Sequence, residues 1–334
     1  MKDTYTLTSF RSINMKTIGV TTTGGDAPGM NAAIRAVTRI AHSAGLEVIG
    51  FERGWEGLLT DTFKRLTPRS VGGIIQLGGT ILRTVRCPEF KSDSGLDKAA
   101  ETLAAHGIEG LVVIGGDGSF KGALELSERT ACLIVGIPAT IDNDVYGTDE
   151  TVGFDTAVNT AVSEIDKIRD TAISHERLFV VEVMGRKRGF LALNVGIAVG
   201  AEVILIPEKE YTLSHVVEVI RENSRKGKRS GIIVAAEGVG DTAKVAREIE
   251  ELTKAEVRLS IVGYAQRGGS PTARSRLLAN LFAEKAIELL CCGRGNCIVG
   301  LQSGQVTSVS LKETCGKSKP IDLDLLKLAE TLAT

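Results

Sequence analysis

The chain has 334 residues and is nearly neutral, with 40 Lys and Arg residues against 41 Asp and Glu residues. This balance gives no electrostatic footprint for a nucleic acid or an anionic membrane, and an aromatic content of 4% argues against base-stacking surfaces. A hydrophobic content of 43%, with 38 glycines but only 7 prolines, excludes wholesale disorder and indicates a folded protein with many tight turns.

Short apolar runs alternate with amphipathic stretches, which indicates βα units around mainly parallel sheets. The length is about two domains' worth, and no linker rich in Ser, Pro and Gly divides the chain. We therefore expect two closely packed α/β lobes. Strands are expected at 17–21, 111–114, 133–137, 178–183, 202–206, 231–236, 259–262 and 297–301. Helices are expected at 31–44, 96–106, 121–129, 156–171, 214–226, 243–253 and 277–291.

Charged residues interrupt every apolar run before it reaches the length of a membrane helix. Residues 1–14 lack the apolar core of a signal peptide, so we expect a short N-terminal extension on a cytoplasmic protein. The six cysteines and four histidines show no zinc-binding spacing.

The first glycine-rich loop, Thr22–Asn31, lies between an expected strand and an expected helix. Its glycines allow a ligand to approach bare backbone, and the following helix N-terminus is a natural phosphate site. It matches neither a Walker A loop nor GxGxxG, so a tight turn is an equally good interpretation.

A second loop, Gly115–Ser119, again follows a strand and precedes a helix. It presents Asp117 among glycines, where a carboxylate can hold Mg²⁺ beside a polyphosphate. The alternative is that Asp117 is only a helix N-cap.

The stretch Thr140–Asp144 reads TIDND and lies beyond a strand end. If it is extended, Asp142 and Asp144 point to the same side, where one carboxylate can accept a hydroxyl proton while the other orients metal or water. Arginines cluster near strand ends and glycine-rich turns, and guanidinium groups suit the charge that develops in phosphoryl transfer. These are Arg86, Arg177, Arg186, Arg258 and Arg267.

Together these stretches resemble the 6-phosphofructokinase family, specifically its bacterial, ATP-dependent members. The resemblance runs almost collinearly from about Lys16 to beyond Gly300 and includes TGGDAPGMNAAIR, IGGDGS, TIDND, EVMGR and GYAQRGGSP. It implies two Rossmann-like three-layer lobes with the active site in the cleft between them. It also implies transfer of the ATP γ-phosphoryl group to the 1-hydroxyl of fructose 6-phosphate with Mg²⁺, in glycolysis.

The resemblance implies a role for each matching position. Asp142 would be the base, with Thr140 beside it, and Arg86 and Arg186 would stabilise the transferring group. The ATP-binding residues would be Gly24, Arg86, Gly116, Asp117, Gly118, Ser119 and Gly122, with Asp117 and Asp144 as Mg²⁺ ligands. The sugar-phosphate residues would be Thr140, Asp142, Asp144, Arg177, Met184, Gly185, Arg186, Glu237, Arg258, Tyr264 and Arg267.

The family's lobes are discontinuous, so the nucleotide lobe would comprise 15–153 plus 266–316 and the sugar-phosphate lobe 154–265 plus 317–334. Arg177 and Arg258 would reach the 6-phosphate across a subunit interface, which requires a homo-oligomer, and the family resemblance implies a homotetramer. An effector such as ADP or phosphoenolpyruvate would bind Arg35, Arg39, Arg169, Glu202, Lys226 and Lys228. Thr62 and Ser230 stand where basic residues are common, so regulation could be weakened or retuned.

The residues after GGD and before TIDND distinguish ATP users from pyrophosphate users in this family. Pyrophosphate enzymes resemble GGDD and PKTIDND, whereas this chain has Gly118 and Ala139. A carboxylate at the first position would obstruct the nucleotide α-phosphate, so we expect ATP. Ala139 departs from the glycine that is usual in ATP enzymes, and a pyrophosphate-dependent enzyme is the alternative.

Two other enzyme classes and one non-enzyme fit the sequence less well. NAD and lipid kinases share a GGDG loop but not TIDND, MGR and QRGGSP in this order. A dinucleotide oxidoreductase needs GxGxxG, which is absent. A non-catalytic regulatory subunit should have lost the base or the arginines, but Asp142, Arg86 and Arg186 are present.

The first prediction concerns Tyr264, which stands where the family usually has His. Tyr is uncharged between pH 6 and 8, whereas His titrates there. Tyr264→His should therefore still bind fructose 6-phosphate but with an altered pH dependence. Titration of sugar affinity between pH 6 and 8 tests this, and identical profiles for the two proteins would contradict it.

Overall fold

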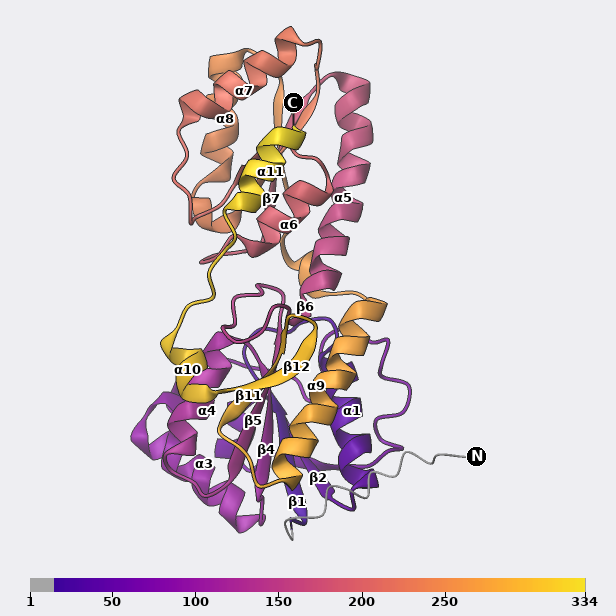
Figure 1. Ribbon diagram of the computed structural model, residues 1–334, viewed down its shortest axis with the longest axis vertical. Helices are drawn as coiled ribbons and strands as arrows, with labels where there is room; N and C mark the ends of the chain where they lie inside the picture. The colour runs from indigo at the N-terminus through magenta and orange to yellow at the C-terminus, as the bar shows by residue number, and fades with distance from the viewer. Residues whose placement is uncertain (1–14, 334) are drawn as a thin grey trace. The chain divides into compact units, whose positions relative to one another are not determined.

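The computed structural model describes residues 15–333, so the expected N-terminal extension at 1–14 lies outside the described residues. The chain divides into two compact units (Figure 1). Unit 1 comprises the described residues up to Asp155 together with Arg267–Lys319, and unit 2 comprises Thr156–Gln266 together with the described residues from Pro320 onward. Both units are α/β, and their two sheets are mainly parallel, as the sequence predicts.

Unit 1 contains an eight-stranded sheet in which the order β12-β11-β5-β4-β1-β2-β3 is extended by β6 pairing with β5. Its strands are β1 (Thr17–Thr22), β2 (Glu47–Phe51), β3 (Phe63–Leu66), β4 (Gly110–Gly115), β5 (Leu133–Thr140), β6 (Val152–Gly153), β11 (Cys297–Gln302) and β12 (Gln305–Ser310). The edge pairs β2–β3 and β11–β12 are antiparallel, and the central pairs are parallel. Every residue of β4 is buried, which is typical of a strand covered by helices on both faces.

The helical segments of unit 1 are α1 (Met30–Ser43), α2 (Trp55–Leu59), η1 (Glu89–Lys91), α3 (Asp93–Ala105), α4 (Asp117–Ser127), α9 (Ala273–Cys291) and α10 (Leu311–Gly316). Figure 1 shows α1 beside α9, with α3 and α4 on the other side of the sheet. This arrangement follows from right-handed crossovers, because the β1–β2 and β4–β5 connections run in opposite directions along the sheet. Phe120, Leu111 and Phe51 are fully buried in the core between the sheet and α3–α4.

Unit 2 contains a parallel four-stranded sheet in the order β10-β7-β9-β8. Its elements are α5 (Phe154–His175, beginning in unit 1), β7 (Leu178–Val183), α6 (Phe190–Ala198), β8 (Val203–Leu205), α7 (Leu213–Arg225), β9 (Gly231–Ala236), η2 (Glu237–Val239), α8 (Thr242–Thr253), β10 (Val257–Ile261), η3 (Gly263–Arg267, ending in unit 1) and α11 (Asp324–Leu332). Helices α7 and α8 pack side by side, and α11 packs on α6 and β8 (Figure 1). Ile249, Val180 and Ile233 lie in the core of this unit.

The helices differ in how their N-termini are capped. Ser92, Thr212, Asp241 and Thr272 each accept a hydrogen bond from a first-turn N–H, at the starts of α3, α7, α8 and α9. By contrast, α1, α4 and α6 begin after glycines that have no side chain to cap them. The two helices that follow the predicted phosphate loops, α1 and α4, belong to this second group.

Candidate active-site residues

The two glycine-rich loops lie at the carboxyl edge of the unit 1 sheet. They follow β1 and β4, which are neighbours, and the chain leaves these strands in opposite directions toward β2 and β5. In open α/β sheets such a switch point opens a crevice at the carboxyl ends of the strands. The sheet order therefore places both predicted phosphate loops where a ligand is expected to bind.

The two loops contact each other closely. The Thr23 N–H donates to the Ile114 carbonyl oxygen at 3.0 Å, and the Ser119 hydroxyl donates to the Thr23 carbonyl oxygen at 3.0 Å. A Cβ atom on Gly115 would lie 2.6 Å from that same Thr23 oxygen, so a side chain cannot be accommodated there. Gly24 has a φ of 83°, which favours glycine, and a Cβ there would lie 3.0 Å from the Ser119 hydroxyl.

Helix α4 begins at Asp117, whereas the sequence predicts a start at residue 121. This expectation is wrong because residues 117–120 already form the first helical turn. The Asp117 carboxylate accepts a hydrogen bond from Lys121 Nζ at 2.7 Å, and this bond raises the pKa of the lysine. The Asp144 carboxylate contributes in the same direction, so the two carboxylates predicted to bind metal act on one ammonium group.

Gly118 and Gly122 have different surroundings, although both are predicted to bind ATP. No atom would lie within 4 Å of a Cβ on Gly118, beyond its chain neighbours and its own helix backbone. At Gly122 a Cβ would lie 3.0 Å from the Phe90 ring and 3.2 Å from Trp55 Nε1, and these two rings are stacked. Gly122 therefore lets α4 pack on the aromatic pair, whereas Gly118 leaves open space.

The TIDND segment is not extended, so the alternation that would place Asp142 and Asp144 on the same side does not apply. Strand β5 ends at Thr140, and Asn143 has a φ of 51°, in the left-handed region. The Asn143 amide donates to the Asp149 carbonyl oxygen at 3.2 Å, and its side-chain oxygen accepts from the Thr151 N–H at 3.1 Å. This buried asparagine thereby closes a loop that presents Asp142 and Asp144 on either side of it.

Lys319 lies against the same loop. Its Nζ donates to the Asp149 carbonyl oxygen at 2.8 Å. Burial lowers the pKa of Lys319 to about 8, although Asp149, Asp144 and Glu150 act in the opposite direction. A cation from the C-terminal part of unit 1 thus helps to neutralise an acidic loop.

Two predicted arginines belong to unit 1. Arg86 is exposed in the segment between β3 and η1. The Arg267 guanidinium lies over Gly25, where a Cβ would be only 2.3 Å from Nη1, and Nη1 is 3.8 Å from the Asp26 carboxylate. Arg267 Nε is buried with no hydrogen-bond partner among the described residues. The structure thus joins Arg267 to the first glycine-rich loop.

In unit 2 the predicted sugar-phosphate residues divide between the two edges of the sheet. Met184, Gly185 and Arg186 follow β7, Glu237 follows β9, and Tyr264 follows β10. Because β10, β7 and β9 are adjacent and parallel, their carboxyl ends bring these residues to one edge. Arg186 Nε lies 3.6 Å from the Glu237 carboxylate, and the Arg186 side chain is 79% exposed.

Arg177 and Arg258 lie at the opposite, amino edge. Arg177 directly precedes β7, and Arg258 is the second residue of β10. Both arginines form ion pairs with Glu256, whose pKa they lower, the hydrogen bond from Arg177 contributing most. Within the chain, therefore, the structure does not bring these two arginines to Met184 and Glu237.

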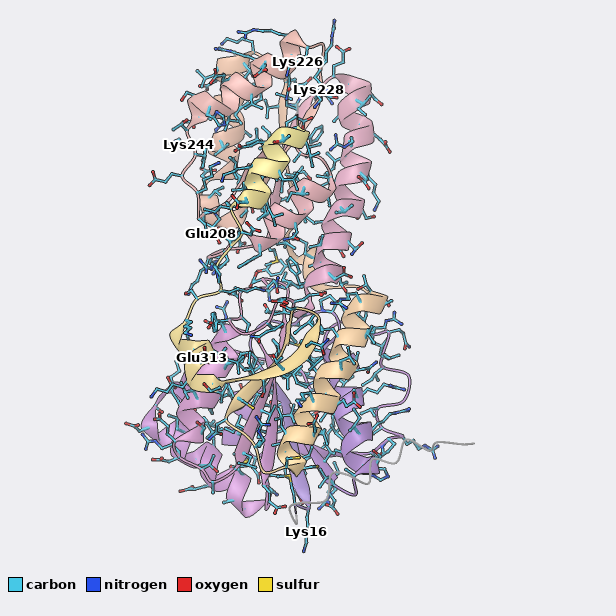
Figure 2. The ribbon with its side chains drawn as sticks, in the orientation of Figure 1. Lys16, Glu208, Lys226, Lys228, Lys244 and Glu313 are labelled. Atoms are coloured by element: carbon cyan, nitrogen blue, oxygen red, sulfur yellow. The ribbon has the colours of Figure 1, made fainter. Side chains whose placement is uncertain are left out.

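The residues expected to bind an effector are only partly together. A cavity of about 410 Å³ at the amino edge of the unit 2 sheet is lined by Glu202 and Lys228, whose charged groups are 3.4 Å apart. Figure 2 shows Lys226 and Lys228 at the same end of unit 2, but Lys226 pairs with Glu222. Arg169 donates to the Val199 carbonyl oxygen, and Arg35 and Arg39 lie on α1 of unit 1.

The sequence did not reveal several residues that organise these loops. They are Lys121, Asn143, Lys319, Arg188, Glu208, Glu256 and Gln266. Some could have been suspected from position, since Asn143 lies within TIDND and Gln266 within GYAQRGGSP. Glu208 and Lys319 carry no local signal, because their partners are distant in the sequence.

Among residues 15–333, no group of three or more His, Cys, Asp or Glu side chains could hold a metal ion. No helix in this part of the chain is both long and apolar enough to cross a membrane.

Comparison with known proteins decides the family. The phosphofructokinase family model matches residues 17–290. The chain belongs to the phosphofructokinase family. Phosphofructokinases named ATP-dependent 6-phosphofructokinase are similar over 96% of this chain and 100% of their own length. One from Thermus thermophilus is 53% identical over 321 residues, and one from Bacillus cytotoxicus is 50% identical over 319 residues.

Solved phosphofructokinase structures share the fold. The Pichia pastoris phosphofructokinase in the T-state has a TM-score of 0.85 at 35% identity, over 91% of this chain and 36% of that one. A pyrophosphate-dependent phosphofructokinase from Marinobacter aquaeolei has a TM-score of 0.82 at 21% identity, over 94% of this chain and 91% of that one. At that identity the second structure supports the fold alone.

The second prediction concerns the pH dependence of stability that Lys319 generates. An unfolded lysine has a pKa near 10.4, and the folded pKa is about 8, so between these values the unfolded chain binds more protons. The contribution of Lys319 to the free energy of unfolding should therefore rise with pH across this window. The free energy of unfolding of the wild type, relative to that of Lys319→Met, should therefore rise by about 1–3 kcal/mol between pH 7 and 10. One pKa unit corresponds to about 1.4 kcal/mol.

Urea unfolding at pH 7, 8, 9 and 10 measures this difference. Lys312→Met is the matched control, because Lys312 is exposed. The difference in free energy of unfolding between wild type and this control should stay constant with pH. If the difference between wild type and Lys319→Met is also constant, Lys319 keeps its proton in the folded state over the whole range.

Proposed function

We propose that this chain transfers the γ-phosphoryl group of ATP to the 1-hydroxyl of fructose 6-phosphate, giving fructose 1,6-bisphosphate in glycolysis. The observation that carries the proposal is full-length identity of 50–53% to proteins named ATP-dependent 6-phosphofructokinases. The position of the glycine-rich loops at the switch point of the unit 1 sheet supports it.

Unit 1 is proposed to bind the nucleotide. Gly24, Gly116 and Gly118 place no side chain on the loop backbone, which phosphate oxygens could then approach, and Ser119 fixes one loop against the other. The uncapped N-terminus of α4 adds its positive dipole end. Such a site suits phosphoryl transfer, in which the protein mainly positions the reactants and stabilises charge.

Asp142 is proposed as the base that accepts the sugar hydroxyl proton. The Asn143 turn holds the loop on which it lies, and Thr140 ends the strand before it. Arg86 and Arg186 are both exposed guanidinium groups, one from each unit, and we assign them to the charge on the transferring group.

Mg²⁺ is proposed to bind Asp117 and Asp144. Mg²⁺ commonly takes one or two protein carboxylates together with substrate phosphates and water, and Asp117 and Asp144 would supply two. The shared influence of both carboxylates on the Lys121 pKa supports placing them around one site. The ion would supply positive charge beside the phosphates, and Lys121, which pairs with Asp117, would add a second cation there.

Fructose 6-phosphate is proposed to bind at the carboxyl edge of the unit 2 sheet, at Met184, Gly185, Glu237 and Tyr264, with Arg267 supplied by unit 1. Arg177 and Arg258 lie at the other edge of that sheet, about 20 Å away for a strand of six residues. One sugar phosphate cannot span this distance. This separation supports their action in the site of another subunit, and hence a homo-oligomer; the homotetramer follows from the family resemblance.

The amino-edge cavity is proposed to bind an anionic effector such as ADP or phosphoenolpyruvate. Its lining includes Lys228, Arg229 and Glu202, and the basic groups suit phosphate. Ser230 also lines it, which is a neutral residue where the family often has a basic one. We therefore expect a weaker or altered effector response.

The test of the proposed reaction is phosphorylation of fructose 6-phosphate with Mg²⁺, run in parallel with ATP and with pyrophosphate. Activity with ATP alone is the expected result. Activity with pyrophosphate would show that the assignment of ATP as the donor is wrong. No activity with either donor would favour a non-catalytic regulatory subunit.

The third prediction tests the base. Asp142→Ser should lower kcat by about 10²–10⁴, because general base catalysis contributes a factor of this size. Binding of fructose 6-phosphate, measured by calorimetry, should change only a few-fold, since most sugar contacts remain. Unchanged turnover would exclude Asp142 as the base.

The fourth prediction tests the donor. Gly118→Asp introduces the carboxylate typical of the pyrophosphate enzymes at an exposed position in the first turn of α4. The fold should tolerate it, because the space is open and an acidic side chain is favourable at a helix N-terminus. The KM for ATP should rise at least tenfold, while the KM for fructose 6-phosphate stays within twofold.

Gly118→Asn is the matched control, because it adds similar bulk without the charge. Its KM for ATP should rise less than that of Gly118→Asp. If Gly118→Asp binds ATP as the wild type does, the donor argument from this position fails.

A further inference from the structure

Gln266 is a fully buried amide that joins two loops of unit 2. Its side-chain oxygen accepts a hydrogen bond from the Met184 N–H at 3.2 Å. Its amide nitrogen donates to the Gly263 carbonyl oxygen at 3.3 Å. One side chain therefore connects the loop after β7 to η3, the turn after β10.

The connection begins where the backbone pairing of the two strands stops. Strands β7 and β10 pair in register from Leu178 and Val257 to Glu182 and Ile261, and the Val262 N–H then donates to the Glu182 carbonyl oxygen at 3.0 Å. Strand β10 ends at Ile261, whereas β7 continues to Val183, where it pairs with Ala236 of β9. The Gln266 side chain supplies the next link between them.

The rest of the β7 loop is fixed from other directions. The Gly189 N–H donates to both Glu208 carboxylate oxygens, at 3.0 and 2.9 Å, and the Gly238 N–H donates to the Gly185 carbonyl oxygen at 3.2 Å. These bonds tie the loop to the segment after β8 and to η2, which follows β9. Gln266 ties its first residue, Met184, to the turn that carries Tyr264.

We propose that Gln266 is a positioning residue for recognition of the sugar phosphate, setting the spacing between the Met184–Arg186 loop and Tyr264. This inference rests on the proposed function of those two segments. An amide suits the task because it offers an acceptor and a donor at the end of one side chain. Without it, the Met184 N–H and the Gly263 carbonyl oxygen lose their partner, and the two segments are free to separate.

Gln266→Met keeps the length of the side chain and removes both polar groups. The KM for fructose 6-phosphate should rise at least tenfold, and the KM for ATP should stay within twofold. A residue that serves stability alone would instead lower the melting temperature and the active fraction and leave both KM values unchanged. That result would overturn the proposal.

Gln266→Asn is the second variant, and it is measurable if Gln266→Met does not fold. It keeps the amide but is one methylene shorter, so it cannot maintain both hydrogen bonds at the native spacing. Its KM for fructose 6-phosphate should lie between those of the wild type and Gln266→Met. If the Gln266→Met protein is insoluble, the KM of Gln266→Asn should still be at least threefold above that of the wild type. A wild-type KM for Gln266→Asn would contradict the proposal that the full length of the glutamine side chain is needed to join the two segments.

Two controls complete the set. Gln305→Met changes an exposed glutamine on β12 and should alter neither KM. Ile249→Ala removes part of the unit 2 core and should lower the melting temperature without a selective change in the sugar KM. If Ile249→Ala reproduces the selective change, loss of stability explains the effect and the proposal fails.

Glu237→Ala separates failure of this inference from failure of the proposed sugar site. If Glu237→Ala leaves the sugar KM unchanged, the assignment of the carboxyl edge of the unit 2 sheet to the sugar phosphate is wrong. If Glu237→Ala raises that KM and Gln266→Met does not, the sugar site stands and only the role of Gln266 is excluded.

Discussion

The close approach of two backbone loops at the centre of the unit 1 sheet is the constraint on which the candidate nucleotide site depends. Side chains are sterically excluded at Gly115, because a Cβ there would lie 2.6 Å from the Thr23 carbonyl oxygen. The same closeness lets Ser119 bond across the gap. Glycines here serve the packing of the loops first, and the bare N–H groups that a phosphate can use follow from it.

Charge compensation organises the acidic part of the site. The TIDND loop and the start of α4 place several carboxylates around Lys121 and Lys319, and Arg274 pairs with Glu150 of the same loop. The pKa of Lys319 falls because burial outweighs its acidic neighbours, whereas the bond to Asp117 raises that of Lys121. The acidic loop is thereby held before any metal or nucleotide binds.

The two edges of the unit 2 sheet carry different sets of groups. Loops at the carboxyl edge carry Met184 and Glu237, and the amino edge carries the cavity with Lys228 and the ion pairs of Glu256. The same parallel strands connect both edges. The four parallel strands thus link the cavity at one edge to the loops at the other, including the pair that Gln266 joins.

The sequence by itself determined the βα units, the two mainly parallel sheets and the glycine-rich loops, because apolar periodicity and glycine clusters are local signals. Motif order then identified the family and named Asp142, Asp117 and Arg186. Only the tertiary structure decided that TIDND turns at Asn143, that Arg177 and Arg258 lie at the opposite edge from Met184, and that Gln266 joins two loops. These features depend on backbone dihedral angles and on contacts between residues far apart in the chain, and neither leaves a periodic trace in the sequence.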